Sequence, residues 1–122
     1  MSEVAYTLVR DESRVKVIQW ELTNGDTGQW YKYSGMFPDK FFQVFGTWGS
    51  GGSCKPEGTN EDYDKPPAKA VQLRDSTHTV LAFTSDGGDT LLQNPMMVRP
   101  NCSAGDDTTA LTVLLCLTVP HR

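Results

Sequence analysis

Histidine and cysteine most often do acid–base and nucleophilic chemistry in proteins, and this chain has few of them. The sequence contains two histidines and three cysteines: His78, His121, Cys54, Cys102 and Cys116. Asp75, Ser76 and His78 supply the residue types of a hydrolase triad. However, three near neighbours on one short segment do not easily converge in the geometry that a triad needs, and no nucleophile-elbow motif is present. The sequence therefore does not predict a hydrolase, and we expect a protein that is not an enzyme.

The three cysteines also lack the spacing of a metal site or of a disulfide framework. Their number is odd, and neither a Cys-x-x-Cys pair nor a zinc-ligand spacing occurs. A small secreted disulfide scaffold has an even and denser set of cysteines. We therefore expect reduced thiols, with Cys116 as a small core residue.

Acidic and glycine-rich segments are the remaining places where an ion or a phosphate could bind. Glu61, Asp62 and Asp64 lie close together in the sequence, and so do Asp86 and Asp89. Oxygen-rich loops can hold Ca²⁺, but the spacing of an EF-hand is missing, so solvated acidic turns explain both clusters. The glycines at positions 46, 49, 51 and 52 lack the Lys-Ser/Thr pair of a phosphate loop and predict a hairpin turn. We therefore predict no metal and no cofactor.

Length and charge limit the class of protein. The chain has 122 residues and a mass of 13.5 kDa, which corresponds to one domain over residues 1–122. The net charge is −4, whereas a nucleic-acid groove is usually basic. The apolar runs are far shorter than the about 20 residues of a membrane span, and the acidic start at residues 1–3 lacks the basic region of a signal peptide. We expect no nucleic-acid partner, no membrane partner and synthesis in a cytoplasm.

Hydrophobic residues recur with a period of 2, which is the period of a β-strand. In the strongest run, residues 109–119, five apolar residues share one face: Leu111, Val113, Leu115, Leu117 and Val119. Residues 14–22 predict a second long strand, and a phase switch near Val17 and Ile18 indicates a β-bulge or a change of sheet. Shorter strands are predicted over residues 4–9, 30–33, 41–48, 53–57, 71–73, 79–84 and 96–99.

Short strands separated by glycine-rich turns predict an all-β fold. We expect a single antiparallel β-sandwich, jelly-roll or immunoglobulin-like, of about 8 strands. Pro56 confines its strand to an edge or to a strand end. Residues 86–89 are expected to form a turn, and residues 90–93 one helical turn that ends before Pro95. Residues 1–10 could extend from the body as an N-terminal arm.

Aromatic side chains gather in the first 50 residues of the chain: Trp20, Trp30, Tyr31, Tyr33, Phe37, Phe41, Phe42 and Trp48. They could fill the core, form a protein interface, in which Trp and Tyr are enriched, or stack against sugars. Alternation along the strands buries only about half of them. The sequence leaves these three roles open.

Four stretches carry a resemblance to a known family: residues 18–28, 43–52, 92–100 and 104–113. In this order and spacing they resemble the small all-β head decoration (cement) proteins of tailed bacteriophages. This sequence differs from the family pattern in its middle part. There, residues 57–63 replace the family's usual turn, and residues 71–76 replace its usual Leu-x-Asp-Pro stretch. None of the four stretches is a catalytic motif.

The resemblance implies a non-enzymatic virion structural protein that bridges neighbouring subunits of the major capsid protein lattice. It also implies a homotrimer on the outer capsid surface, made in the cytoplasm of a bacterial host. The residues that would make contacts under this hypothesis are Val4, Tyr6, Leu8, Trp30, Tyr31, Phe37, Arg99 and Asp106. The first three could add a strand to a neighbour, and Arg99 and Asp106 could form a pair between subunits. The alternatives are a carbohydrate- or receptor-binding β-sandwich module and a tail or connector component of a virion.

Overall fold

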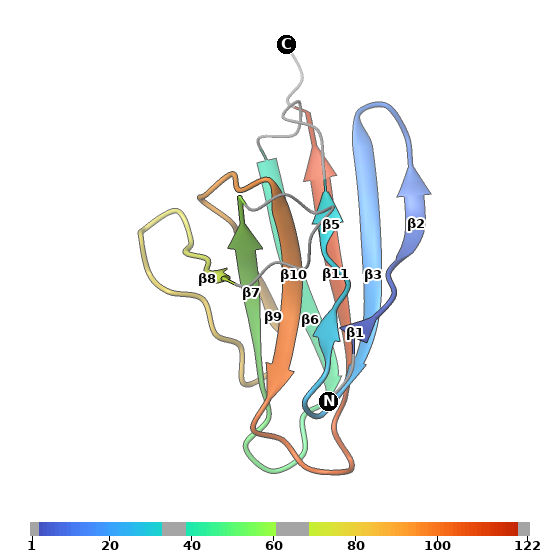
Figure 1. Cartoon of the computed structure of the whole chain (residues 1–122), viewed down its shortest axis with the longest axis vertical. Helices are drawn as coiled ribbons and strands as arrows, with labels where there is room; N and C mark the ends of the chain where they lie inside the picture. Colours follow the sequence, from blue (N-terminus) through green and yellow to red (C-terminus); the bar gives the residue numbers. More distant parts are fainter. Residues whose placement is uncertain (1–2, 33–38, 61–68, 120–122) are drawn as a thin grey trace.

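Two β-sheets packed face to face make up the described chain (Figure 1). The computed structural model describes residues 3–32, 39–60 and 69–119. The six-stranded sheet contains β1 (Glu3–Val4), β4 (Thr27–Gly28), β5 (Tyr31–Lys32), β7 (Ser53–Thr59), β8 (Val71–Gln72) and β10 (Met97–Ser103). The five-stranded sheet contains β2 (Thr7–Asp11), β3 (Val15–Thr23), β6 (Asp39–Thr47), β9 (Gly87–Thr90) and β11 (Ala110–Thr118).

The order of strands is β1-β4-β10-β7-β8 in the six-stranded sheet, where β5 also pairs with β10, and β2-β3-β11-β6-β9 in the five-stranded sheet. β1 and β4 run parallel, and the other strand pairs of the described residues are antiparallel. The predicted all-β sandwich is confirmed. No helix long and apolar enough to cross a membrane occurs within residues 3–32, 39–60 and 69–119.

The centre of the five-stranded sheet is β11, which pairs with β3 on one side and β6 on the other. Val113 lies opposite Trp20 of β3 and opposite Val44 of β6, and all three side chains are fully buried. The strict alternation along β11 therefore marks a buried face, as the sequence predicts. The irregularity predicted near Val17 and Ile18 lies at that level of the ladder, because Leu8 pairs with Ile18 and Arg10 with Val17. The extra residue belongs to β2, however, and β3 itself pairs with β11 without interruption.

The six-stranded sheet accommodates two prolines at one level of its ladder. Pro56 of β7 lies directly opposite Pro100 of β10. In an antiparallel pair, alternate opposing residues exchange no backbone hydrogen bonds. Cys54 and Cys102 are opposing residues two positions away on each strand, and their N–H groups point away from each other. Pro56 and Pro100 therefore also form a pair that exchanges no backbone hydrogen bonds, and the ladder between β7 and β10 loses no bond through their missing N–H groups. β7 is next to the edge, with only the two-residue β8 outside it.

Two local predictions for residues 79–93 are wrong, and a third holds only in part. A turn is expected over residues 86–89, but residues 87–89 belong to β9 (Gly87–Thr90), and the ring of Phe41 lies where a side chain on Gly88 would be. Residues 90–93 do not form a helical turn, because Leu91 N–H donates to the Lys40 carbonyl and Leu92 N–H donates to the Arg74 carbonyl. The expected strand at 79–84 reduces to two isolated bridges in the described chain.

Residues 3–11 belong to the body of the sandwich and do not extend from it as part of an N-terminal arm. β1 joins the six-stranded sheet and β2 joins the five-stranded sheet. Between them, the ring of Tyr6 packs edge-on against Trp20 at 6.3 Å and against Tyr31 at 5.2 Å. These contacts hold the N-terminal segment across one edge of the sandwich.

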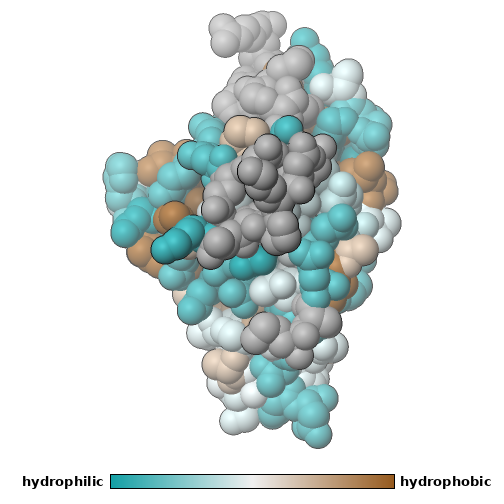
Figure 2. Space-filling view, viewed as in Figure 1, coloured by the Kyte–Doolittle hydropathy of each residue, from teal (hydrophilic) through white to brown (hydrophobic). Residues whose placement is uncertain are grey.

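The space between the sheets is filled by apolar side chains. The largest of them are fully buried: Ile18, Trp20, Leu22, Phe42, Leu91, Met97, Leu111, Leu115 and Leu117. Exposed apolar residues include Leu8 and Val9 on β2 and Val71 on β8, and apolar colouring lies near opposite sides of the view in Figure 2.

Candidate functional site

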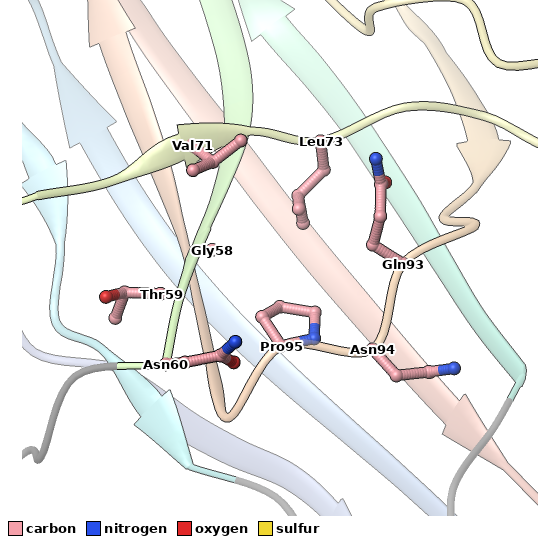
Figure 3. A pocket seen from close by; sticks show the side chains of 8 residues that line it. All are labelled: Gly58, Thr59, Asn60, Val71, Leu73, Gln93, Asn94 and Pro95. Atoms are coloured by element: carbon pink, nitrogen blue, oxygen red, sulfur yellow. The ribbon is translucent and has the colours of Figure 1, made fainter.

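A pocket of about 250 Å³ lies at the edge of the sandwich where the chain crosses from one sheet to the other (Figure 3). The end of β7, the start of β8 and the segment before β10 meet there. The residues that line the pocket are Gly58, Thr59, Asn60, Val71, Leu73, Gln93, Asn94 and Pro95. Because they come from three separate segments, only the folded chain brings them together.

The apolar part of the pocket depends on Gly58. Leu73 and Pro95 point toward each other in Figure 3, and Leu73 is only 2% exposed. A Cβ atom on Gly58 would lie 2.5 Å from Pro95 Cγ and 3.0 Å from Leu73 Cδ2. The missing side chain at position 58 therefore lets Leu73 and Pro95 approach the backbone of β7 and form one apolar wall.

The polar lining of the pocket includes two carboxamide side chains, Asn60 and Gln93, which lie on opposite sides of Pro95 in Figure 3. The Oδ1 of Asn60 accepts a hydrogen bond from Met96 N–H at 3.0 Å, and the Oε1 of Gln93 accepts one from Arg74 N–H at 2.7 Å. A backbone N–H can only donate, so the chemistry of these bonds fixes which end of each amide is oxygen. Neither amino group has a hydrogen-bond partner among the described residues. The polar lining therefore presents donors.

Asn94 plays a different part, because its side chain turns away from the pocket (Figure 3). Its Oδ1 accepts a hydrogen bond from Lys40 Nζ. Lys40 is only 1% exposed, and burial lowers the pKa of its ammonium group. The Lys40 carbonyl also accepts from Leu91 N–H at 3.0 Å, so Lys40 holds the crossing segment at two points and supports the wall of the pocket.

Sequence reasoning missed Lys40, although a signal was available. Lys40 shares the alternating phase of Phe42 and Val44 and therefore points inward from β6. A lysine in the phase of core residues indicates a buried ammonium group, which needs polar partners. Asn60 and Gln93 carry no comparable signal, because exposed-looking amides are ordinary in loops.

Among the described residues, the lining of the pocket contains no ionisable side chain. Within the described ranges, no group of three or more His, Cys, Asp or Glu residues could hold a metal ion. The arrangement can bind through an apolar wall and amide donors.

A second hollow of about 210 Å³ lies between β6, β9 and β11 and includes Phe41, Thr90 and Cys116. Phe41 is 46% exposed there. Cys116 is half-buried and lies in the outward phase of β11. The prediction of Cys116 as a core residue is therefore wrong; the phase of the strand places it opposite the buried leucines.

The structure places most of the residues predicted as contacts with a partner, and their role stays a prediction. Val4 belongs to β1, Tyr6 packs on the core, Tyr31 is buried in β5 and Leu8 is exposed on β2. Phe37 lies outside the described residues. Val4 and Tyr31 thus belong to the six-stranded sheet and Leu8 to the five-stranded sheet, and Tyr6 packs against Tyr31.

Arg99 and Asp106, expected to pair between subunits, have separate partners within the chain. Arg99 Nε lies 3.0 Å from a carboxylate oxygen of Glu57, and its guanidinium carbon lies 4.4 Å from the ring centroid of Trp30. Asp106 accepts hydrogen bonds from Ser50 N–H at 2.9 Å and from the Thr108 hydroxyl at 2.6 Å. These contacts explain both residues as parts of the fold.

Comparison with known proteins gives the fold of this chain. No family model and no curated protein matches the sequence. A cupin domain structure from Bordetella pertussis matches with a TM-score of 0.51 at 16% identity and covers 98% of this chain and 96% of that one. A cupin superfamily protein from Desulfitobacterium hafniense matches with a TM-score of 0.39 at 11% identity, over 94% of this chain and 76% of that one. This chain is thus similar in fold to a cupin domain, and the two sheets agree with a jelly-roll.

The resemblance to phage decoration proteins is wrong. A structure that matches over nearly the whole chain is a bacterial cupin domain and not a phage decoration protein, which removes the basis for a capsid role and for a location on the virion. The carbohydrate-binding and tail or connector alternatives find no support in these structures either. The homotrimer stays a prediction; light scattering on a size-exclusion column tests it, with three chains of 13.5 kDa as the expected mass.

Proposed function

We propose that this chain is a non-enzymatic binding module for a small organic molecule with an apolar body and carbonyl or carboxylate oxygens. The site is the pocket between the end of β7, β8 and residues 93–95. One observation carries the proposal: Asn60 and Gln93 use their oxygens within the protein and present amino groups beside the apolar wall of Leu73 and Pro95.

The hydrogen-bonding pattern selects the chemistry of the ligand. An oxygen that only accepts can bond to either amino group, whereas an ammonium group, which only donates, cannot. A carboxylate gains more than a neutral carbonyl, because hydrogen bonds to charged groups are about twice as strong. The wall formed by Leu73 and Pro95 favours a branched or short aliphatic body.

The volume selects the size of the ligand. Pockets for drug-sized molecules have volumes of about 300–1,000 Å³, and this pocket has about 250 Å³. We therefore expect a ligand of only a few carbon atoms.

Three probes of equal shape test this chemistry: isobutyrate, isobutyramide and isobutylamine. We would follow the side-chain NH₂ signals of Asn60 and Gln93 in ¹⁵N NMR spectra during titration. Isobutyrate is expected to shift both signals most, isobutyramide less, and isobutylamine not at all. Binding of isobutylamine with equal affinity, or no shift with isobutyrate at about 50 mM, a concentration far above millimolar affinity, would contradict the proposal.

Isosteric variants then test the two residues. Asn60→Asp and Gln93→Glu keep the oxygen that accepts from Met96 or Arg74 and replace the amino donor with a second oxygen. Each is expected to weaken isobutyrate binding by about tenfold or more, because a hydrogen bond to a charged group contributes about 1.5–3 kcal/mol. The matched control is Asn24→Asp, whose oxygen accepts from Gly105 N–H at 3.0 Å in the loop that follows β10, away from the pocket. Equal affinity in Asn60→Asp and Asn24→Asp would refute the assigned role.

A further inference from the structure

Two of the three cysteines lie directly opposite each other on neighbouring strands. Cys54 of β7 and Cys102 of β10 are register partners in the antiparallel pair. Both are fully buried, with an exposed fraction of 0%, and both are free thiols. Because opposing residues of a pair point to the same face of a sheet, the two thiols share the core side of the six-stranded sheet.

The backbone hydrogen bonds identify the type of this pair. Cys54 exchanges hydrogen bonds with Phe83, with its N–H donating at 2.9 Å and its carbonyl accepting at 2.8 Å. Cys102 N–H donates to the Asp26 carbonyl, and Gly25 N–H donates to the Cys102 carbonyl. Each cysteine thus directs its polar backbone groups away from the other, so the two form a non-hydrogen-bonded pair.

This type of pair brings cysteines within reach of a disulfide. Opposing Cα atoms in a non-hydrogen-bonded pair are about 4.5 Å apart, and disulfides join Cα atoms that are about 4.4–6.8 Å apart. The strands need not move to bring the backbones together. Cys116 does not compete, because it lies on the outward face of β11 in the other sheet.

The surroundings keep both thiols protonated at neutral pH. Burial raises the pKa of the Cys54 thiol above its ordinary value, and the neighbouring Cys102 thiol raises it further. Burial also raises the pKa of the Cys102 thiol. Since a thiolate is the attacking species in thiol–disulfide exchange, we expect exchange to occur while β7 and β10 are separated and the folded chain to retain the product.

We propose that Cys54 and Cys102 form a cross-strand disulfide when the chain meets a low-molecular-weight disulfide such as oxidised glutathione. One cysteine thiolate attacks a glutathione sulfur, forms a mixed disulfide and releases one glutathione thiolate. The second cysteine then attacks the cysteine sulfur of the mixed disulfide and releases the other glutathione. Overall, two thiols are oxidised, one oxidised glutathione is reduced to two thiols, and the two protons end on glutathione. Reduced glutathione reverses the sequence.

The disulfide would join β7 to β10 at Cys54, four residues before Gly58. It would also close a loop of the chain, because Cys54 and Cys102 are 48 positions apart. A cross-link of this kind restricts the unfolded chain most when the loop is long. The folded chain should then favour the disulfide more strongly than the unfolded chain does, because the native register already holds the cysteines opposite each other.

The experiment compares these two states in the Cys116→Ser variant. The protein is equilibrated with varied ratios of oxidised to reduced glutathione, once as the refolded chain in buffer and once as the unfolded chain in concentrated urea. Each sample is then quenched with acid, alkylated and analysed by intact mass spectrometry. We expect the effective concentration of the Cys54–Cys102 thiols to be roughly 100-fold higher in the folded chain than in urea, as expected for a long loop closed without strain. A ratio of tenfold or less, or a folded chain that ends mainly as the mixed disulfide with glutathione, would overturn the proposal.

Two further measurements make the result independent of one variant. The wild-type chain is treated in the same way, and peptide mapping should show Cys54 linked to Cys102. The matched control is Cys102→Ser, which also has two cysteines but places them on different sheets. It is expected to give only mixed disulfides with glutathione, and an equal yield of internal disulfide in this control would also refute the assignment.

Discussion

Replacement of Gly58 by alanine tests the tightest contact of the proposed site. Gly58 lies between Val98 of β10 and Val71 of β8, so its backbone is held on both sides. The added Cβ would lie 2.5 Å from Pro95 Cγ, 2.9 Å from Pro95 Cβ and 3.0 Å from Leu73 Cδ2. The Pro95 ring is stiff, so the wall of the pocket must move to accept the methyl group.

The expected magnitude follows from two opposing effects. Overpacking by one methyl group costs about 1–3 kcal/mol, whereas replacing glycine with alanine restricts the unfolded chain and stabilises by about 0.4–1 kcal/mol. We therefore expect the free energy of unfolding of Gly58→Ala to fall by about 1–2 kcal/mol. With a urea m-value of about 1–3 kcal/mol/M, the midpoint should fall by roughly 0.5–1.5 M.

Urea unfolding followed by circular dichroism measures the change, and Gly87→Ala is the matched control. Gly87 is exposed, and an added Cβ there would have its nearest contact at 3.8 Å, so we expect a change within about 0.5 kcal/mol. Isobutyrate titration of the folded Gly58→Ala variant should show weaker binding. If Gly58→Ala matched Gly87→Ala in stability and bound isobutyrate like the wild type, the description of the wall would be refuted.

Three further predictions concern the core and two charged groups. Gly28→Ala would place a Cβ 2.5 Å from Trp20 Cδ1 and 2.5 Å from Pro100 Cδ; overpacking and a disturbed indole hydrogen bond should lower the free energy of unfolding by about 2–4 kcal/mol in urea. Hydrogen bonds lower the pKa of Asp106 from its ordinary value of 3.8, so its stabilising effect is present above pH 3.8 and is lost as the pH falls through the folded pKa; acid titration of Asp106→Asn should show a flatter decline than the wild type. Burial lowers the pKa of Lys40 from 10.5, so between its folded pKa and 10.5 the unfolded chain binds more protons. The unfolding free energy of the wild type relative to Lys40→Met should therefore rise with pH in that window, and equal urea midpoint differences at pH 8 and 10 would contradict this.

Much of the fold follows from local alternation of residue types. In β11 and β6, side chains two residues apart point to the same face, and one face of each strand is buried. That periodicity can be recognised without knowing which strands pair. The same reasoning fails for β9, where two glycines suggest a turn. The missing side chain of Gly88 instead admits the ring of Phe41 from the neighbouring strand, a reason that no local pattern contains.

The candidate site could not be predicted in the same way. Its walls come from residues near 58–60, 71–73 and 93–95, which meet because the chain crosses between sheets after β9. Asn60 and Gln93 become specific only through the backbone donors that occupy their oxygens. Those donors belong to Met96 and Arg74, and neither contact follows from the spacing of residue types.

The failed family resemblance has a physical explanation in the turns that carried it. Residues 104–113 contain an aspartate whose carboxylate accepts from Ser50 N–H and from Thr108, and a strand that alternates. These residue types are typical of a capped turn that leads into a half-buried strand, and any antiparallel sandwich requires such turns. They are therefore evidence for the architecture and carry little information on what the protein binds.

Function in this chain must then depend on side chains that the architecture does not need. Trp20 and Phe42 fill the space between the sheets completely, so packing alone explains them. The amino groups of Asn60 and Gln93 take no part in the described hydrogen bonds of the fold, in which only the two amide oxygens accept from a backbone N–H. Donors that the fold does not use, placed beside an apolar wall, are what a ligand with acceptor oxygens requires, and this is why the isosteric variants at these two positions separate binding from folding.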